Sequence, residues 1–204
     1  MRVKCIAVLF CLLPMFSAVA QDAAQVLQRR LATIKTYSAN FEQKVLDPQQ
    51  QVVQQGTGTL MLKQPAQFRF ETVTPEPNLF IGDGKTLWFY NEVLEQLTLY
   101  DAESEVNRTP FALLTSNDAS LWAQYSISQK GNTFDISAKD SDSPVKQLTL
   151  TFSEDVLSAM RVLDMNNQLS VFEFTLVQQN ITLENGLFRF TAPEGTEIDD
   201  QRQN

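Results

Sequence analysis

Hydrophobic and polar residues alternate along most of the chain, a two-residue period that is typical of β-strands with one buried face. The alternation is clear at 38–45, where polar residues flank Ala39 and Phe41, and it continues through 51–63 and 67–71. The same pattern resumes after residue 125 and persists, with short turn-forming breaks, to residue 177. It predicts a sheet of roughly ten strands, and a sheet of that size is expected to curl or close.

Three segments depart from this alternation. Residues 22–36 carry Leu27 and Leu31 on one stripe with polar residues elsewhere, the 3.6-residue period of an amphipathic helix. Residues 109–114 open with Thr-Pro and continue with apolar residues, which predicts a short helix with threonine as its N-cap. Near the end of the chain, 187–190 is expected to form a short strand before an acidic tail.

The clearest hairpin turns at Asp-Gly 83–84, because this dipeptide readily adopts the positive φ angles that a tight turn between twisted strands requires. The strand after the turn is apolar on both faces, with Leu87 and Phe89 on one and Trp88 and Tyr90 on the other. One face is therefore expected to pack against a neighbouring layer, while the opposite face is also shielded or lines a cavity.

The chain of 204 residues has the 43% hydrophobic and 20% charged composition of one folded domain. Fourteen residues are phenylalanine, more large apolar side chain than a thin sheet needs to cover one face. A cavity of lipid size would account for the excess. Two alternatives remain open at this point, an ordinary packed barrel or sandwich and a transmembrane barrel, although the polar C-terminus and the lack of aromatic girdles disfavour the second.

The first twenty residues predict a cleavable export signal. Arg2 and Lys4 give a basic start, 5–16 form an apolar run, and Ala-Val-Ala at 18–20 supplies small residues for cleavage after Ala20. The apolar run is too short for a permanent membrane anchor, and no cysteine stands where the first residue of a lipidated protein would be. We therefore expect a free mature protein.

The mature protein is expected to be a single domain over residues 21–204. Cys5 and Cys11 leave with the signal, so it would contain neither a thiol nor a disulfide. Removing Arg2 and Lys4 from the 16 basic residues leaves 14 against 24 acidic ones. Nucleic acid and anionic membrane surfaces are expected to repel such a chain.

The reactive side chains do not predict an enzyme. The chain has no histidine, and no carboxylate cluster has the spacing of a calcium loop. Carboxylate pairs such as Glu154-Asp155 or Asp199-Asp200 are adjacent along extended chain, so they point to opposite faces and cannot flank one glycosidic bond. Glycine-rich phosphate loops and serine elbows are absent as well. Neither a metal nor a cofactor is expected.

Four segments resemble a known family in their order and spacing. They are QQGTGTL at 54–60, KQPAQFRF at 63–70, DGKTLWFY at 83–90 and TPF at 109–111. Together they resemble LolA, the family of periplasmic outer-membrane lipoprotein carrier proteins. The similarity extends from the first helix to the acidic tail, and the segment DGKTLWFY is its most specific part.

The resemblance implies a mainly β fold with a few helices: an incomplete, unclosed antiparallel β-barrel of about eleven strands with an α-helical lid over an apolar cavity. It also implies a monomer without a cofactor in the periplasm of a Gram-negative bacterium. Such a carrier accepts acylated lipoproteins from LolCDE, an ABC transporter of the inner membrane, and delivers them to LolB, a receptor in the outer membrane. A periplasmic binding protein for another lipid or amphiphile on the same half-barrel is the alternative.

Candidate site residues follow from strand parity and from the family motif. The acyl-chain-binding wall is expected to contain Leu60, Leu62, Phe68, Phe70, Leu87 and Phe89. The lid is expected to involve Gln64, Phe111 and Leu114. Many family members have arginine where this chain has Gln64, and glutamine can still donate a hydrogen bond but carries no charge. A more weakly latched lid is therefore expected.

Overall fold

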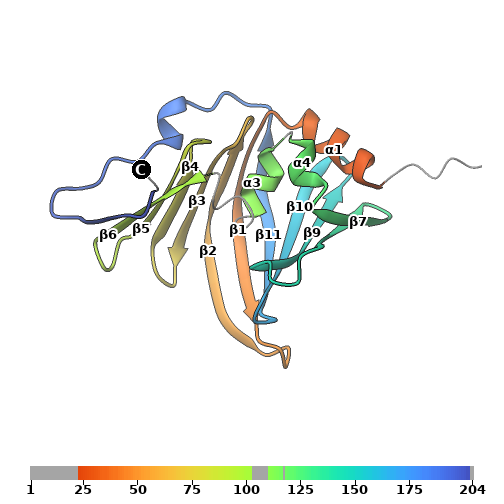
Figure 1. Ribbon diagram of the computed structural model, residues 1–204, viewed down its shortest axis with the longest axis horizontal. Coiled ribbons are helices and arrows are strands. Elements are labelled where there is room, and N and C mark those ends of the chain that lie inside the picture. The colour runs from red at the N-terminus through yellow and green to blue at the C-terminus, as the bar shows by residue number, and fades with distance from the viewer. Residues whose placement is uncertain (1–22, 103–109, 117, 203–204) are drawn as a thin grey trace, which may run out of the picture.

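The computed structural model describes residues 23–102, 110–116 and 118–202, so the expected signal over 1–20 lies outside the described residues. These residues form one twelve-stranded sheet in the order β12-β6-β5-β4-β3-β2-β1-β11-β10-β9-β8-β7. The sheet curves around a concave face, as Figure 1 shows. Its edge strands β12 and β7 do not pair with each other, so the barrel is incomplete. The expected open barrel with a few helices is confirmed.

The strands have the alternating burial that the sequence predicted. In chain order they are β1 Thr36–Leu46, β2 Val52–Lys63, β3 Gln67–Thr74, β4 Asn78–Gly82, β5 Thr86–Asn91, β6 Gln96–Asp101, β7 Tyr125–Lys130, β8 Thr133–Ala138, β9 Val145–Ser153, β10 Val156–Asp164, β11 Leu169–Gln179 and β12 Glu197–Asp200. All neighbours pair antiparallel except β12 and β6, which are parallel.

Two meanders build the sheet. Strands β1 to β6 follow one another outward from the centre, and the chain then crosses to the opposite edge, where β7 begins a second meander that returns to pair β11 with β1. The crossing contains α3 Pro110–Thr115 and α4 Ala119–Trp122, the latter capped by the Asp118 side chain. With α1 Ala23–Thr33, these helices gather at one end of the concave face (Figure 1).

The first helix is shorter than expected. It ends at Thr33, because Thr36 and Tyr37 already belong to β1 and pair with Lys63 and Leu62 of β2. Its buried residues Leu27 and Leu31 are those of the predicted apolar stripe. No helix in the part of the chain that the structure describes combines the length and apolar character needed to cross a membrane.

The expected strand at 187–190 is wrong. The segment Asn185–Phe188 is a 3₁₀ helix, labelled η2, and Phe188 is fully buried. This segment contacts β3, which already pairs with β2 on one side and β4 on the other. Since no unpaired edge is available there, the segment cannot extend the sheet. The free edge belongs to β6, where the acidic tail adds β12.

The hairpin at 83–84 forms as predicted, but only Gly84 of its turn has a positive φ, at 91°. The Asp83 carboxylate accepts hydrogen bonds from the backbone N–H groups of Lys85 and Thr86, at 2.8 and 2.9 Å. Each face of the following strand contributes to a packed cluster. Leu87 belongs to the main core, whereas Tyr90 packs in a second cluster beside Phe190, with ring centroids 5.0 Å apart.

Candidate functional site

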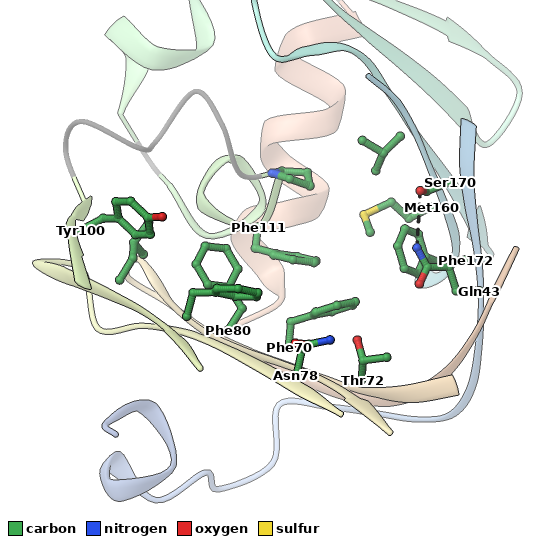
Figure 2. A pocket seen from close by; sticks show the side chains of 14 residues that line it. Gln43, Phe70, Thr72, Asn78, Phe80, Tyr100, Phe111, Met160, Ser170 and Phe172 are labelled. Atoms are coloured by element: carbon green, nitrogen blue, oxygen red, sulfur yellow. Dashed lines mark hydrogen bonds between the residues drawn. The ribbon is translucent and has the colours of Figure 1, made fainter. Parts of the chain in front are cut away.

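A cavity of about 530 Å³ opens on the concave face of the sheet, beneath α3 (Figure 2). This volume lies within the range of roughly 300–1,000 Å³ that is usual for small-molecule sites. Its lining comes from seven strands and from α3: Gln43, Phe70, Thr72, Asn78, Phe80, Leu87, Phe89, Tyr100, Pro110, Phe111, Met160, Val162, Ser170 and Phe172.

Stacked aromatic rings form the part of the cavity nearest α3. Phe70 stacks on Phe41 with ring centroids 4.7 Å apart and on Phe111 at 5.0 Å, and its ring meets Phe172 edge-on at 5.9 Å. In Figure 2 the ring of Phe111 lies above that of Phe70. Such contacts add stabilisation beyond the area they bury. The helix α3 is therefore held to the sheet by the same rings that line the cavity.

Gly58 makes room for this aromatic layer. A Cβ atom at Gly58 would lie 2.5 Å from Cζ of Phe41 and 2.0 Å from the carbonyl oxygen of Glu71. Phe41 and Gly58 are cross-strand partners in β1 and β2. The absence of a side chain on Gly58 thus lets Phe41 lie flat against β2, where its ring supports Phe70.

The structure divides the six expected wall residues into two groups. Phe70, Leu87 and Phe89 line the cavity, and 39% of Phe89 is exposed. The other three, which lie in the packed core of the same face and do not touch the cavity, are Leu60, Leu62 and Phe68. Cross-strand pairing places all six on one face of the sheet. Strand parity carries no information about which of these positions a helix covers.

The three expected lid residues occupy different places. Phe111 reaches into the cavity from α3, whereas Leu114 is buried in the main core. Gln64 donates from Nε2 to the carbonyl oxygen of Leu31 in α1, at 2.8 Å. The helix α3 is tied to the same turn by a backbone hydrogen bond from Ala66 N–H to the carbonyl oxygen of Thr115, at 3.3 Å.

Arg30 provides a second attachment for α1. Its guanidinium donates to the carbonyl oxygen of Glu154 at 3.2 Å and to Oδ1 of Asn132 at 3.0 Å. Its Cζ also lies 5.2 Å from the ring centroid of Phe152 and 5.7 Å from that of Phe134. Since these groups belong to the β7–β8 turn, to β8 and β9 and to the β9–β10 turn, Arg30 joins α1 to the second meander.

The cavity wall is electrically neutral. Among the lining residues that the structure describes, none carries a formal charge, and Tyr100 is the single titratable one. Deeper in the core, burial raises the pKa of Tyr37, whose hydroxyl donates to the carbonyl oxygen of Leu157 at 2.8 Å. No group of three acidic or cysteine side chains in the described part of the chain is placed to hold a metal ion. Such a wall suits an uncharged, largely apolar ligand.

Several lining residues were not predicted from the sequence. Phe80, Met160, Val162 and Phe172 are apolar residues of alternating strands, and that pattern does not distinguish them from ordinary core. Four polar lining residues could not be predicted from the sequence, because polar positions in a strand usually face solvent. They are Gln43, Thr72, Asn78 and Ser170.

Comparison with known proteins gives one consistent family. The family model described as "Outer membrane lipoprotein carrier protein LolA" matches residues 32–191. A protein of Pasteurella multocida named outer-membrane lipoprotein carrier protein is 43% identical over 92% of this chain and 91% of its own length. A Vibrio cholerae protein of the same name is 40% identical over 98% of both chains.

One solved structure shares the fold at low sequence identity. An uncharacterised conserved protein from Thermus thermophilus superposes with a TM-score of 0.51 and 13% identity, covering 87% of this chain and 99% of its own. That likeness concerns the fold alone. The family match over most of the chain and the two close relatives concern the sequence. On this evidence the chain belongs to the LolA family of outer membrane lipoprotein carrier proteins.

Proposed function

We propose that this protein is a periplasmic carrier that shields the acyl chains of a lipoprotein in the cavity beneath α3. The observation that carries the proposal is the neutral, aromatic wall of a cavity of about 530 Å³, in a chain that belongs to the LolA family. Phe70, Leu87 and Phe89 would contact the acyl chains directly. Leu60, Leu62 and Phe68 would support them from the core below.

The energetics of acyl chains explain why a carrier needs partners on both sides. Each buried CH₂ is worth roughly 0.8 kcal/mol, so two or more acyl chains hold a lipoprotein in a membrane by tens of kcal/mol. Spontaneous release would be negligible. Extraction therefore requires an energised step, for which the LolCDE transporter is the candidate, and delivery to LolB requires that the carrier bind its cargo less tightly than a membrane does.

The proposed carrier works as a soluble monomer without a cofactor and without a catalytic step. The basic start, apolar run and small-residue cleavage pattern of residues 1–20 support export to the periplasm, with residues 21–204 as the carrier domain. With 14 basic and 24 acidic residues, residues 21–204 have a formal net charge of −10, which disfavours adsorption of an empty carrier to anionic lipid. Recognition would then fall to partner proteins.

Loading would require displacement of α3. The ring of Phe111 lies 5.3 Å from that of Phe68 and 5.0 Å from that of Phe70, so it occupies space that acyl chains could fill. Leu114 and the hydrogen bond from Ala66 to Thr115 hold the helix to the core and to the turn. The neutral hydrogen bond from Gln64 to Leu31 fastens the neighbouring α1. These contacts are modest and can be exchanged for contacts with cargo.

The proposal is tested by release of a lipoprotein from spheroplasts. Purified residues 21–204 are added to spheroplasts that synthesise a tagged outer-membrane lipoprotein, with ATP available, and the supernatant is analysed by gel filtration. We expect the lipoprotein to appear in a soluble 1:1 complex. An established carrier in a parallel sample controls for the competence of the spheroplasts.

Two variants make the assay specific for the cavity. Phe89→Glu places a charge in the cavity wall at a half-exposed position, whereas Leu94→Glu introduces the same charge in the β5–β6 turn, where 66% of the leucine is exposed. The first variant should lose release and the second should retain it. Absence of release by the folded wild type, with uptake of free lipid instead, would favour the general lipid-binding protein.

A further inference from the structure

On four of its strands the cavity wall has a regular pattern of one aromatic and one polar residue, whereas on β10 the apolar Met160 and Val162 stand at these two levels. In each of four strands, a polar lining residue stands two positions from a phenylalanine on the same face of the sheet. The pairs are Phe41 and Gln43 in β1, Phe70 and Thr72 in β3, Phe80 and Asn78 in β4, and Phe172 and Ser170 in β11.

In all four strands the polar residue is the one farther from the helices. The β2–β3 turn lies at the helical end, since Ala66 contacts the end of α3, and Thr72 follows Phe70 away from it. Likewise β1 starts beside α1, where the carbonyl oxygen of Lys35 accepts from Gln64 N–H, and runs from Phe41 to Gln43. Because β4 and β11 run the opposite way, Asn78 and Ser170 precede their phenylalanines.

The polar residues form neighbouring pairs at this end of the cavity. Thr72 and Asn78 are cross-strand partners in β3 and β4, next to the pair formed by Phe70 and Phe80. Gln43 donates from Nε2 to Oγ of Ser170 at 3.4 Å, across β1 and β11. Figure 2 shows Thr72, Gln43 and Ser170 toward one side of the cavity and Tyr100 on the other.

We propose that this polar layer, Gln43, Thr72, Asn78 and Ser170, binds the carbonyl-bearing head of the acylated cargo and fixes its direction in the cavity. The inference rests on the carrier role proposed above. The hydroxyls of Thr72 and Ser170 and the amide of Gln43 can donate to ester or amide carbonyls, which are good acceptors. The acyl chains then run along the aromatic layer toward α3, and the peptide leaves at the end of the sheet away from the helices.

One orientation of the cargo is favoured because polar groups left without hydrogen-bond partners are costly. Hydroxyl and amide groups in an empty cavity can bind water, but acyl chains that fill the cavity displace it. A polar group that is then buried without a hydrogen bond loses its hydration without any compensation, which is unfavourable. The opposite orientation of the cargo would bury these four groups against hydrocarbon and place its carbonyls among the aromatic rings, so the orientation with matched groups is favoured.

The test compares two probes in purified residues 21–204. One is a hydrocarbon fluorophore without any hydrogen-bonding group, and the other is a synthetic peptide whose N-terminal cysteine carries ester-linked acyl chains. The double variant Thr72→Val with Ser170→Ala removes two donors with little change of shape. The matched control is Thr175→Val with Ser126→Ala, at exposed positions outside the cavity.

We expect the double variant to raise the Kd for the acylated peptide about tenfold, because two hydrogen bonds to the carbonyl groups are lost. A factor of ten corresponds to about 1.4 kcal/mol. Its Kd for the hydrocarbon probe should be unchanged or lower, and the control should match the wild type with both probes. An unchanged Kd for the peptide, or equal losses for both probes, would overturn the polar-layer inference alone. Failure of the wild type to bind the acylated peptide would instead contradict the proposed carrier role itself.

Discussion

Phe68 and Phe89 point to the same face of the sheet but differ in what surrounds them. Phe68 is fully buried beneath Phe111, whereas Phe89 lies at the cavity with 39% of its surface exposed. We predict that Phe68→Ala lowers the free energy of unfolding by about 3–5 kcal/mol, the usual cost for a large core residue. Phe89→Ala should cost less than about 2 kcal/mol, because its ring is only partly removed from water. Urea unfolding measures both values, and equal losses would show that the distinction between core and wall is wrong.

Gly58 gives a second prediction at this scale. A methyl group there would overlap the ring of Phe41 and the backbone of Glu71, so Gly58→Ala should destabilise the fold by about 1–3 kcal/mol. It should also weaken binding of a hydrocarbon probe, because Phe41 supports Phe70 in the cavity wall. Gly186→Ala is the control, since no atom lies within 4 Å of the Cβ position there. Similar thermal midpoints for the two variants would contradict this account.

Sequence alternation predicts the face of a residue but not its depth. Leu60 and Phe70 are cross-strand partners on one face, yet only Phe70 reaches the cavity. The difference arises from the curvature of the sheet and from the position of α3, neither of which is encoded in the residues of β2 or β3 themselves. Gln43 and Thr72 were not predicted to line the cavity for a related reason. In the sequence, a polar strand residue that faces a cavity looks the same as one that faces solvent.

At the level of elements, α1 depends on Arg30 for its attachment to the second meander. Arg30→Ala removes two hydrogen bonds and the contacts with two aromatic rings, which should lower the free energy of unfolding by about 1 kcal/mol. Hydrogen exchange of the α1 amides should increase more than that of the β1 amides. Arg29→Ala, one residue earlier and exposed, is the matched control. Equal exchange in α1 for the two variants would contradict the role of Arg30.

Elements were predicted well where their pattern was local. The alternating pattern predicts the strands, Asp-Gly predicts the hairpin at 83–84, and Thr-Pro predicts the short helix at 110–115. The error at 187–190 has a topological cause: its apolar residues lie against the outer face of strands that are already paired, so they form η2. Which strand edge is free depends on the order of the whole sheet, and a local pattern cannot reveal it.

Among the described residues, the three α-helices gather at one end of the open sheet. The chain crosses from β6 to β7 through α3 and α4, and this crossing covers the helical end of the concave face (Figure 1). The C-terminal segment shields the outer face near Tyr90 and adds β12 to the edge of β6. The cavity is thus the result of an unclosed meander, and its two ends differ in chemistry. The sequence motifs indicate the family, but they contain no information about the size of the cavity.

The most direct test of the central claim is to locate the acyl chains within a loaded carrier. An acylated peptide with a photoreactive group at the end of one acyl chain is bound to residues 21–204, irradiated, and the labelled residues are identified by mass spectrometry. We predict labelling of the cavity wall near α3, at Phe70, Phe80, Phe111 or Phe172. Labelling concentrated on the outer cluster of Tyr90, Leu97 and Phe190 would contradict the account, because it would place the acyl chains on the opposite face of the sheet.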